Sequence, residues 1–286
     1  MWNQKLCLGT STGFEYSIKE QIRMFRLAGF EGYFVGWERG MDIKDIKAYG
    51  DSLGMIFQSM HAPFGKVASM WEQTDKTELA IDEHLCCLRD CADNDVPIMV
   101  VHAFIGFDKH EPTQFGIDNF RIIVEEAQKL GVKVAFENVE GEEYLAAVME
   151  AFKDYDCVGF CWDTGHEMCY NHSQDMMALY GDRILCTHIN DNLGIRNYSG
   201  KITDQDDLHL LPFDGIADWQ DIVHRLNKHN FDDILTFELS KKSKWKRHDN
   251  DMYDQMRFED YVAAAYNRAC RVATLKLRDK KIVDHI

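Results

Sequence analysis

The chain has 286 residues, of which 45% are hydrophobic and 12% aromatic, so it can bury a sizeable core as one large domain or two ordinary ones. Its 48 acidic and 32 basic residues give a formal charge of -16, which argues against duplex nucleic acid as a partner. No apolar run approaches the roughly 20 residues that span a bilayer. The nine cysteines include no Cys-x-x-Cys pair and indicate reduced thiols, so we expect a cytoplasmic protein with no membrane partner.

Short apolar runs alternate with stretches of helical periodicity along the whole chain. The first half is predicted as strand 6–12, helix 17–29, strand 32–37, helix 42–54, strand 55–61, loop 65–74, helix 75–93, strand 98–102 and helix 113–131. The second half is predicted as strand 134–137, helix 142–152, strand 158–163, helix 173–180, strand 184–188, loop 191–216, helix 218–229, strand 234–238, loop 241–254 and helix 255–277. Ser17 with Glu20 forms a capping box, and Gly29 ends the first helix.

This order contains eight strands and eight helices with no linker between them. The strands are continuous apolar runs, as expected for a parallel sheet that is covered on both faces. We therefore predict an α/β fold, a single (β/α)8 TIM barrel domain that spans residues 1–286. A doubly wound sheet is the alternative, although it rarely has eight such regular units.

Ligand-type side chains stand at the carboxyl ends of the last five strands, and those ends converge on one mouth in a barrel. They are His102, Glu137, Asp163, His188 and Glu238. A buried acid is costly unless it is paired, and a metal ion is a common partner. We predict that Glu137, Asp163, His188 and Glu238 hold one divalent metal. A mostly oxygen site with one nitrogen suits Zn²⁺, Mn²⁺, Mg²⁺ or Co²⁺ without choosing among them.

Besides the four predicted metal ligands, five residues are predicted near the same mouth: His61, His102, His166, Asp207 and His209. They would either hold a second or third metal or donate and accept hydrogen bonds with a polyol substrate. Trp37, with Phe64 or Trp71, would form an apolar wall against a sugar face or simply belong to the core.

The chain has one basic run, which follows the last strand. It contains Lys241, Lys242, Lys244 and Arg247. We interpret it either as a solvated loop or as a clamp for one phosphate or carboxylate of a small substrate, because phosphate sites in such barrels often use the last loops.

Several motifs together resemble the xylose-isomerase-like TIM barrel superfamily, which includes ketose 3-epimerases and zinc-dependent apurinic endonucleases. They are His61-Ala-Pro-Phe, Glu137-Asn, Trp162-Asp-Thr-Gly-His166, His188-Ile-Asn-Asp, His209 followed by Leu-Pro and Gly215-x-x-Asp218-Trp219, and Phe237-Glu238. The resemblance covers nearly the whole chain. It is specific for the superfamily and weak for the individual member.

The resemblance implies one metal on Glu137, Asp163, His188 and Glu238, with the two glutamates also transferring protons and His166 binding a substrate oxygen. The expected function is isomerisation or epimerisation of a small sugar, ketose or sugar phosphate through an enediolate. Oligomers are common among relatives, and the sequence leaves a monomer and a homo-oligomer both open.

The alternative function is a multi-zinc phosphodiester or phosphate-ester hydrolase of the apurinic-endonuclease type. That class uses three zincs, and this chain has a counterpart for each of the nine ligand-type residues named above. The charge of -16 argues against a DNA substrate, because a DNA enzyme needs a basic face. A non-catalytic barrel is the third hypothesis, and the complete set of four core ligands argues against it.

Overall fold

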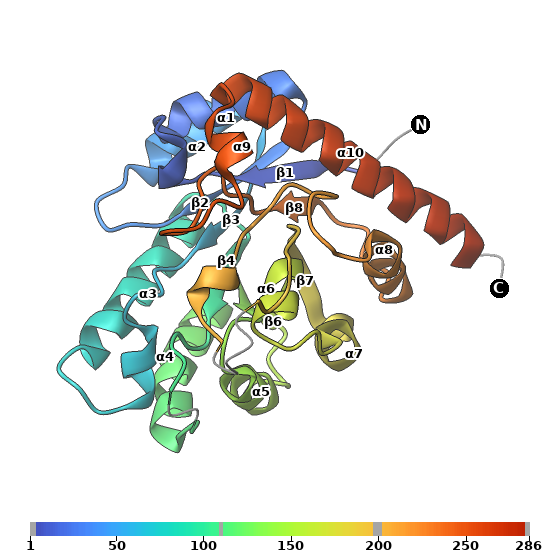
Figure 1. Cartoon of the computed structure of the whole chain (residues 1–286). Helices are drawn as coiled ribbons and strands as arrows, with labels where there is room; N and C mark the ends of the chain where they lie inside the picture. Colours follow the sequence, from blue (N-terminus) through green and yellow to red (C-terminus); the bar gives the residue numbers. More distant parts are fainter. Residues whose placement is uncertain (1–3, 109–110, 197–201, 284–286) are drawn as a thin grey trace.

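Eight parallel strands occupy the centre of the computed structural model, which describes residues 4–108, 111–196 and 202–283 (Figure 1). The strands are β1 (Leu6–Gly9), β2 (Gly32–Gly36), β3 (Ile56–His61), β4 (Ile98–His102), β5 (Lys133–Glu137), β6 (Val158–Asp163), β7 (Ile184–His188) and β8 (Leu235–Phe237). Their order in the sheet is β7-β6-β5-β4-β3-β2-β1-β8. Every strand thus lies beside its neighbour in sequence, as in a barrel.

The two ends of this sheet meet between β7 and β8. Ile189 and Phe237 form an isolated parallel bridge. The Ile189 amide donates to the Thr236 carbonyl at 2.8 Å, and the Glu238 amide donates to the Ile189 carbonyl at 3.2 Å. These bonds bring β7 and β8 together, and the predicted (β/α)8 barrel is confirmed.

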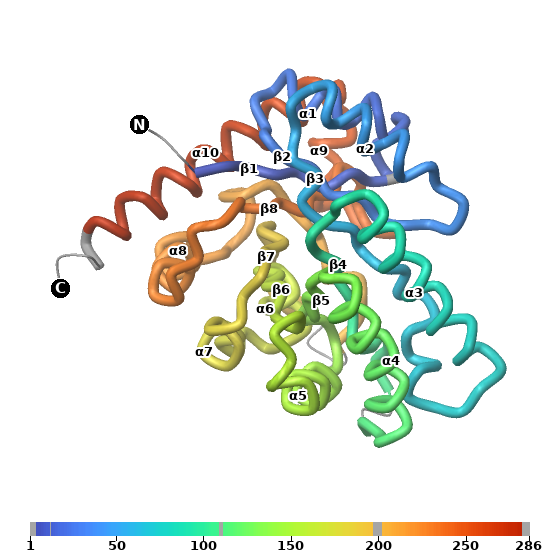
Figure 2. The backbone as a smooth tube through the Cα atoms, turned by 180° about the vertical axis from the view of Figure 1, so that it is seen from behind, coloured from blue at the N-terminus to red at the C-terminus, as the bar shows by residue number. Residues whose placement is uncertain are grey.

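Helices surround the strands on all sides, as Figure 1 and the view from behind in Figure 2 show. They are α1 (Ile18–Ala28), α2 (Ile43–Ser52), α3 (Thr77–Asp93), α4 (Gln114–Leu130), α5 (Glu142–Ala151), α6 (Thr164–Cys169), α7 (Met176–Tyr180), α8 (Trp219–Lys228), α9 (Asp251–Asp254) and α10 (Phe258–Val283), with short 3-10 turns η1 (Thr12–Phe14), η2 (Val67–Trp71), η3 (Gly181–Arg183) and η4 (Asp204–Asp206). The capping box of Ser17 and Glu20 is present, and Gly29 ends α1 with φ 119°. Within the described ranges, none of these helices is long and apolar enough to cross a membrane.

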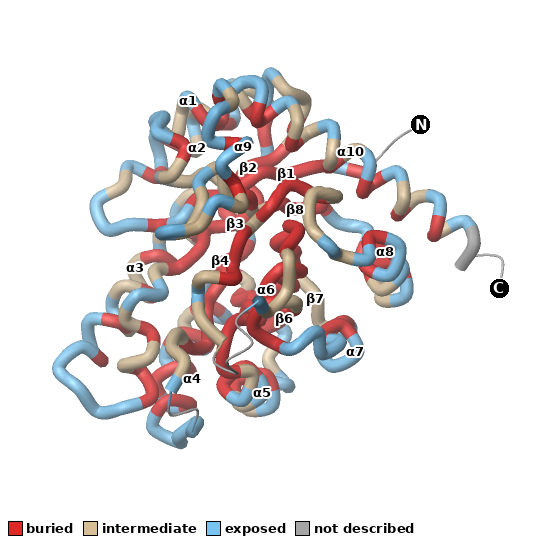
Figure 3. Tube along the Cα trace, viewed as in Figure 1, coloured by how far each residue is buried: buried red, intermediate tan, exposed pale blue. Residues whose placement is uncertain are grey.

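The strand interiors are buried, and the helices keep exposed outer faces (Figure 3). Because side chains alternate along a strand, every second residue points into the barrel. An inner cluster contains Val100, Ala135, Cys161 and Cys186. The next inward position on these four strands, two residues later, is His102, Glu137, Asp163 and His188 in turn. The barrel thus carries its polar residues one layer above an apolar and thiol layer.

The helices differ from the prediction at four places. The described residues contain two short helices beyond the eight predicted ones: α6, in a segment for which no element was predicted, and α9, within the predicted loop 241–254. Helix α6 begins directly after β6 because the Asp163 side chain caps it, accepting the His166 amide at 2.6 Å. Only 176–180 of the helix predicted at 173–180 is helical. The last helix begins at Phe258 and continues to Val283.

Candidate metal centre

Four of the predicted ligands meet at the carboxyl end of the barrel. Ligand atoms of Glu137, Asp163, His188 and Glu238 all lie within 4.8 Å of one another. His188 Nδ1 is 2.8 Å from Glu137 Oε1 and 3.2 Å from Glu238 Oε2. The side chains of Glu137, Asp163 and His188 are fully buried, whereas that of Glu238 is 28% exposed. We call this set the core group.

A second group shares Glu137 with the core group. Its other carboxylate oxygen, Oε2, lies 3.2 Å from Nε2 of His61 and 3.2 Å from Nε2 of His102. These three side chains form a separate cluster of ligand atoms within 4.8 Å. Glu137 therefore has one oxygen toward each group, in the manner of a bridging carboxylate.

A third group shares Asp163 with the core group and also contains His166 and His209. Asp207 belongs here as well, because its Oδ1 is 2.8 Å from His209 Nε2 and 3.5 Å from His166 Nε2. All nine predicted ligand-type residues are thus brought together in three adjoining groups.

The tautomers of three histidines are fixed by the backbone. Nδ1 of His61 donates to the Ala62 carbonyl at 2.8 Å, Nδ1 of His166 to the Asn138 carbonyl at 3.0 Å, and Nδ1 of His209 to the Glu238 carbonyl at 3.1 Å. Because a carbonyl oxygen only accepts, each ring presents Nε2 to the carboxylates. A neutral ring then has a lone pair facing an anion, and this contact requires a proton or a cation between them. The residues therefore fit divalent metal ions.

Two asparagines hold Asp163 in place. Asn190 Nδ2 donates to both carboxylate oxygens of Asp163, at 3.1 and 2.9 Å. Asn138 accepts the Asp163 amide at 2.8 Å and donates to the Asp163 carbonyl at 2.8 Å. Neither asparagine was predicted to have a separate role, although Asn138 directly follows Glu137 and Asn190 lies two residues after His188. Such hydrogen bonds orient a ligand and are characteristic of metal centres.

Charge pairing and burial raise the pKa values of some groups in the site and lower those of others. Burial raises the pKa of Asp163 to about 6. Burial alone would raise the pKa of Glu238, but the combined effect of the nearby His188 and His209 is larger and lowers it to about 2. For His209, burial alone would lower the pKa, and the carboxylates of Asp207, Glu238 and Asp163 together raise it to about 9. In the metal-free site, the raised pKa of His209 thus favours a protonated ring beside the carboxylates of Asp207 and Glu238.

His209 should make the stability of the metal-free protein depend on pH. Its folded pKa of about 9 exceeds the ordinary value of 6.5, so its contribution is complete below pH 6.5 and is lost as the pH rises through about 9. We expect His209 alone to lower the free energy of unfolding by on the order of 3 kcal/mol over this window, measured by urea unfolding after chelation. His209→Asn should flatten the fall. A metal-free protein that gains stability between these pH values would contradict the assignment.

Two cavities meet at Glu238. One, the β1–β3 cavity, has a volume of about 620 Å³ and is lined by Phe34, Trp37 and Phe64 among others. The other, the histidine cavity, has a volume of about 400 Å³ and is lined by His102, His166 and His209 among others. Trp37 and Phe64 therefore lie where an apolar wall was predicted. Trp71 does not line either cavity, because its ring is buried and its Nε1 donates to the Ala103 carbonyl at 2.6 Å.

The basic run lies beside the mouth, and its charges already have protein partners. Lys244 is the member that lines the histidine cavity, where its Nζ is 3.2 Å from Asp207 Oδ2. Lys241 pairs with Asp254, Lys242 with Glu15, and Arg247 with Asp206 and Asp249. The predicted clamp for a phosphate or carboxylate therefore depends on Lys244.

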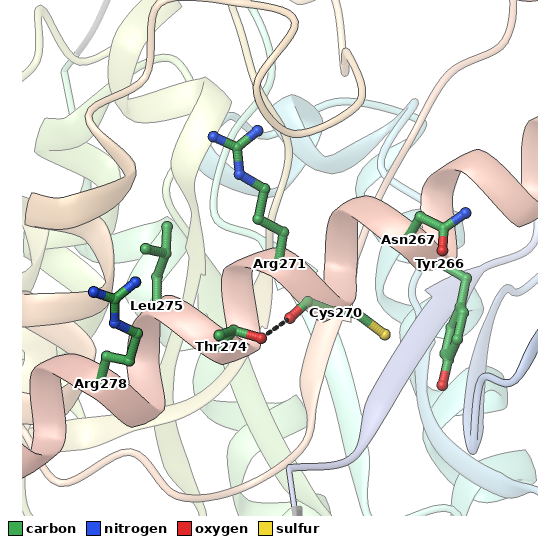
Figure 4. Close-up of a pocket in the computed structure, with 7 residues that line it drawn as sticks. All are labelled: Tyr266, Asn267, Cys270, Arg271, Thr274, Leu275 and Arg278. Atoms are coloured by element: carbon green, nitrogen blue, oxygen red, sulfur yellow. Dashed lines mark hydrogen bonds between the residues drawn. The ribbon is translucent and has the colours of Figure 1, made fainter.

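A hollow of about 680 Å³ lies elsewhere, along the outer side of α10 (Figure 4). It is lined by residues of that helix alone, including Arg271 and Arg278, and it is wide open to solvent. It contains none of the three ligand groups. The mouth, although its cavities are smaller, is therefore the candidate site.

The sequence matches the family described as "Xylose isomerase-like TIM barrel" over residues 19–258. A protein from Sinorhizobium fredii (strain NBRC 101917 / NGR234), described as uncharacterized protein y4fM, is 32% identical over 149 residues. That match covers 48% of this chain and 44% of the relative, so the chain spans less than half of the length of the curated relative it matches.

Solved structures share the fold at low sequence identity. D-psicose 3-epimerase with D-tagatose from Clostridium cellulolyticum H10 superposes with a TM-score of 0.74 at 13% identity, covering 96% of this chain and 99% of the other. The IOLI protein with a binding zinc atom superposes with a TM-score of 0.73 at 18% identity, covering 95% and 98%. At these identities the likeness establishes the fold of the whole barrel.

Proposed function

Because the chain belongs to the xylose isomerase-like TIM barrel family, we propose that it is a divalent-metal-dependent isomerase or epimerase of a small sugar, ketose or sugar phosphate. One observation carries the proposal: Glu137 and Glu238 approach the same nitrogen of His188, at 2.8 and 3.2 Å, next to two cavities. Three of the structural neighbours are named as sugar epimerases, which is consistent with this class of reaction.

The metal would be held by the core group, with Asn190 and Asn138 fixing Asp163. When bound, such a cation attracts electron density from a substrate carbonyl and the adjacent hydroxyl, which makes the neighbouring C–H group more acidic. The chain supplies the rest. Its fixed histidine tautomers and buried carboxylates are oriented before a substrate arrives, so little reorganisation is required during the reaction.

Two carboxylates on different sides of the barrel suit the transfer of a carbon-bound proton. Strands β5 and β8 are three steps apart around the ring, so Glu137 and Glu238 face a substrate from two directions. One glutamate would remove the proton and leave an enediolate. Return of a proton by the other glutamate to the opposite face inverts the carbon, whereas return to the neighbouring carbon isomerises the sugar. His166, which lines the histidine cavity, would bind a substrate oxygen.

The lining of the β1–β3 cavity favours an uncharged sugar at that side. Among the described residues that line it, none is Lys or Arg, and the charged ones are Glu38 and Glu238. The lining also includes the hydroxyl-bearing residues Ser11 and Tyr16 and the aromatic residues Phe34, Trp37 and Phe64. A substrate phosphate would instead have to lie near Lys244 in the histidine cavity.

Solvent isotope exchange tests this proposal. The metal-loaded protein should incorporate deuterium from D₂O at a carbon next to the carbonyl of a ketose, detected by proton NMR. Free ketoses and ketose phosphates are compared at equal concentration, and the chelated protein serves as the control. If the metal-loaded protein shows no exchange with either substrate class, it does not have the proposed activity.

The second and third ligand groups favour a second candidate, a phosphodiester or phosphate-ester hydrolase with two or three metals. The observation is that Glu137 Oε2 is occupied by His61 and His102, while Asp207 lies between His166 and His209. In an epimerase with one metal, the residues outside the core group would bind only the substrate or one another. These residues are His61, His102, His166, Asp207 and His209.

Metal content separates the two candidates. About one metal per chain in the purified protein, measured by inductively coupled plasma mass spectrometry, supports the isomerase. Two or three tightly bound zincs, together with hydrolysis of bis(4-nitrophenyl) phosphate, support the hydrolase. His209→Asn should lower the zinc count of a three-metal protein by one and leave the count of a one-metal protein unchanged.

A further inference from the structure

The mouth of the barrel has two cavities, although the proposed reaction takes place at one point. The β1–β3 cavity, of about 620 Å³, and the histidine cavity, of about 400 Å³, have three lining residues in common: His61, Phe64 and Glu238. Glu238 belongs to the core group, so the two cavities meet beside the ligands of the proposed metal. Their other lining residues differ, so they extend from this junction toward different parts of the mouth.

The histidine cavity alone has room for the sugar that reacts. Ligand sites usually have volumes of roughly 300–1,000 Å³, and a monosaccharide is among the smaller ligands. Polar side chains for its hydroxyl groups also lie here, since His166, Asp207 and Lys244 line this cavity and none of them lines the other. A monosaccharide bound in the histidine cavity would therefore leave the β1–β3 cavity without substrate.

The lining of the β1–β3 cavity suits a second sugar ring. Phe34, Trp37 and Phe64 supply aromatic rings, against which the apolar C–H groups of a sugar ring can pack. Ser11 and Tyr16 carry hydroxyl groups that can donate and accept hydrogen bonds with those of a sugar. The basic side chain of the mouth, Lys244, lines the histidine cavity instead. This lining fits a neutral ring better than a phosphate.

Two aromatic residues of the β1–β3 cavity are exposed and yet packed against other rings. Tyr16 is 40% exposed and stacks on Phe258 of α10, with ring centroids 4.8 Å apart. Phe64 is 43% exposed and stacks on the ring of His102, with centroids 4.7 Å apart. Rings that are already packed in this way lose little side-chain entropy when a ligand covers them, so they favour binding.

We propose that the substrate is a ketose that carries a second sugar ring. The ketose unit reacts at the core group, with its hydroxyl groups in the histidine cavity. The glycosidic bond passes the junction formed by His61, Phe64 and Glu238, and the second ring fills the β1–β3 cavity. This inference rests on the proposed function and names its substrate class. Contacts with such a remote part of a substrate increase kcat as well as affinity, so a free ketose should react more slowly.

Deuterium exchange with free and glycosylated ketoses tests the proposal. The metal-loaded full-length protein is incubated in D₂O with D-fructose, with lactulose or with isomaltulose. The two disaccharides carry galactose or glucose on a fructose unit, and exchange next to the carbonyl is followed by proton NMR. We expect kcat/KM for the better disaccharide to exceed that for fructose by at least about tenfold. A wild type that exchanges fructose as well as either disaccharide would overturn the inference and leave the proposed function intact.

Gly36→Trp is designed to fill the β1–β3 cavity. Gly36 ends β2 and lines this cavity, a Cβ atom there meets no atom within 4 Å, and the backbone is not in the left-handed region. The ratio of kcat/KM for the disaccharide to that for fructose should fall to about one, with metal content unchanged. Gly65→Trp is the matched control, because a Cβ atom at Gly65 is equally unobstructed and Gly65 lines neither cavity. It should keep the wild-type ratio.

The remaining outcomes separate this inference from the proposed function. Equal losses for fructose and the disaccharides in Gly36→Trp would show that the β1–β3 cavity binds the reacting sugar itself, which overturns the inference. Wild-type exchange with ketose phosphates but with none of these three sugars also overturns it and supports the proposed function. Exchange with no sugar of either kind overturns both. The wild-type comparison decides even if a variant does not fold.

Discussion

Glu137→Gln should lower kcat/KM by about 10⁴-fold and leave a folded protein without its core metal. Glu137 gives one oxygen to His188 and the other to His61 and His102. The amide of glutamine keeps one acceptor, but its other end donates hydrogen bonds. Because the Nε2 atom of His61 can accept from that amide, the contact survives as a neutral hydrogen bond and no cation is required.

Deuterium exchange into substrate and metal content should be measured together for this variant. Glu150→Gln on α5 is the matched control, because the side chain of Glu150 is 74% exposed and pairs with Lys153 on the surface. It should behave as the wild type. If Glu137→Gln retains both metal and exchange, Glu137 is neither the ligand nor the proton-transfer group.

Gly165→Ala should weaken metal binding by about 10- to 100-fold although it changes no ligand. A Cβ atom at this position would lie 1.9 Å from Asn190 Oδ1 and 2.9 Å from its Cγ. Asn190 is fully buried and donates to both oxygens of Asp163, so its displacement releases that ligand. Overpacking of this kind usually costs about 1–3 kcal/mol.

Helix propensity alone predicts the opposite effect of this substitution on stability. Gly165 lies inside α6, where alanine is intrinsically better than glycine by about 1 kcal/mol. If the helix were independent of Asn190, the substitution would stabilise the protein. Isothermal titration with Zn²⁺ and thermal unfolding should be compared with Gly65→Ala, since a Cβ at Gly65 meets no atom within 4 Å. Unchanged affinity in Gly165→Ala would show that Asn190 does not hold Asp163.

The barrel and the convergence of its ligands could be predicted because both depend on local patterns. The strands are apolar runs, β3 to β8 each end at or next to a ligand-type residue, and parallel strands in a barrel direct their carboxyl ends to one side. Helix α6 could not be predicted, because six residues that include a glycine are too short for a helical period to appear. What starts it is the side chain of Asp163, which was assigned only to metal.

The sharing of ligands could not be predicted either. Whether Glu137 serves one group or two depends on how far His61 and His102 reach across the mouth, and this follows from barrel geometry rather than from spacing along the chain. The ion pairs of the basic run could not be predicted for the same reason. Its partners Glu15 and Asp206 lie 227 and 41 residues away from Lys242 and Arg247, so the charges looked available in the sequence but are engaged in the fold.

The closure of the barrel between β7 and β8 has a consequence for metal binding. β8 is only three residues long, and Ile189 and Phe237 form an isolated bridge there. His188 precedes this seam on one side and Glu238 follows it on the other, 3.2 Å apart. Local opening of the seam would separate these two ligands, and a cation bound by both would resist that opening. If the core group binds a metal as proposed, metal affinity and closure of the barrel would be linked, so that each would strengthen the other.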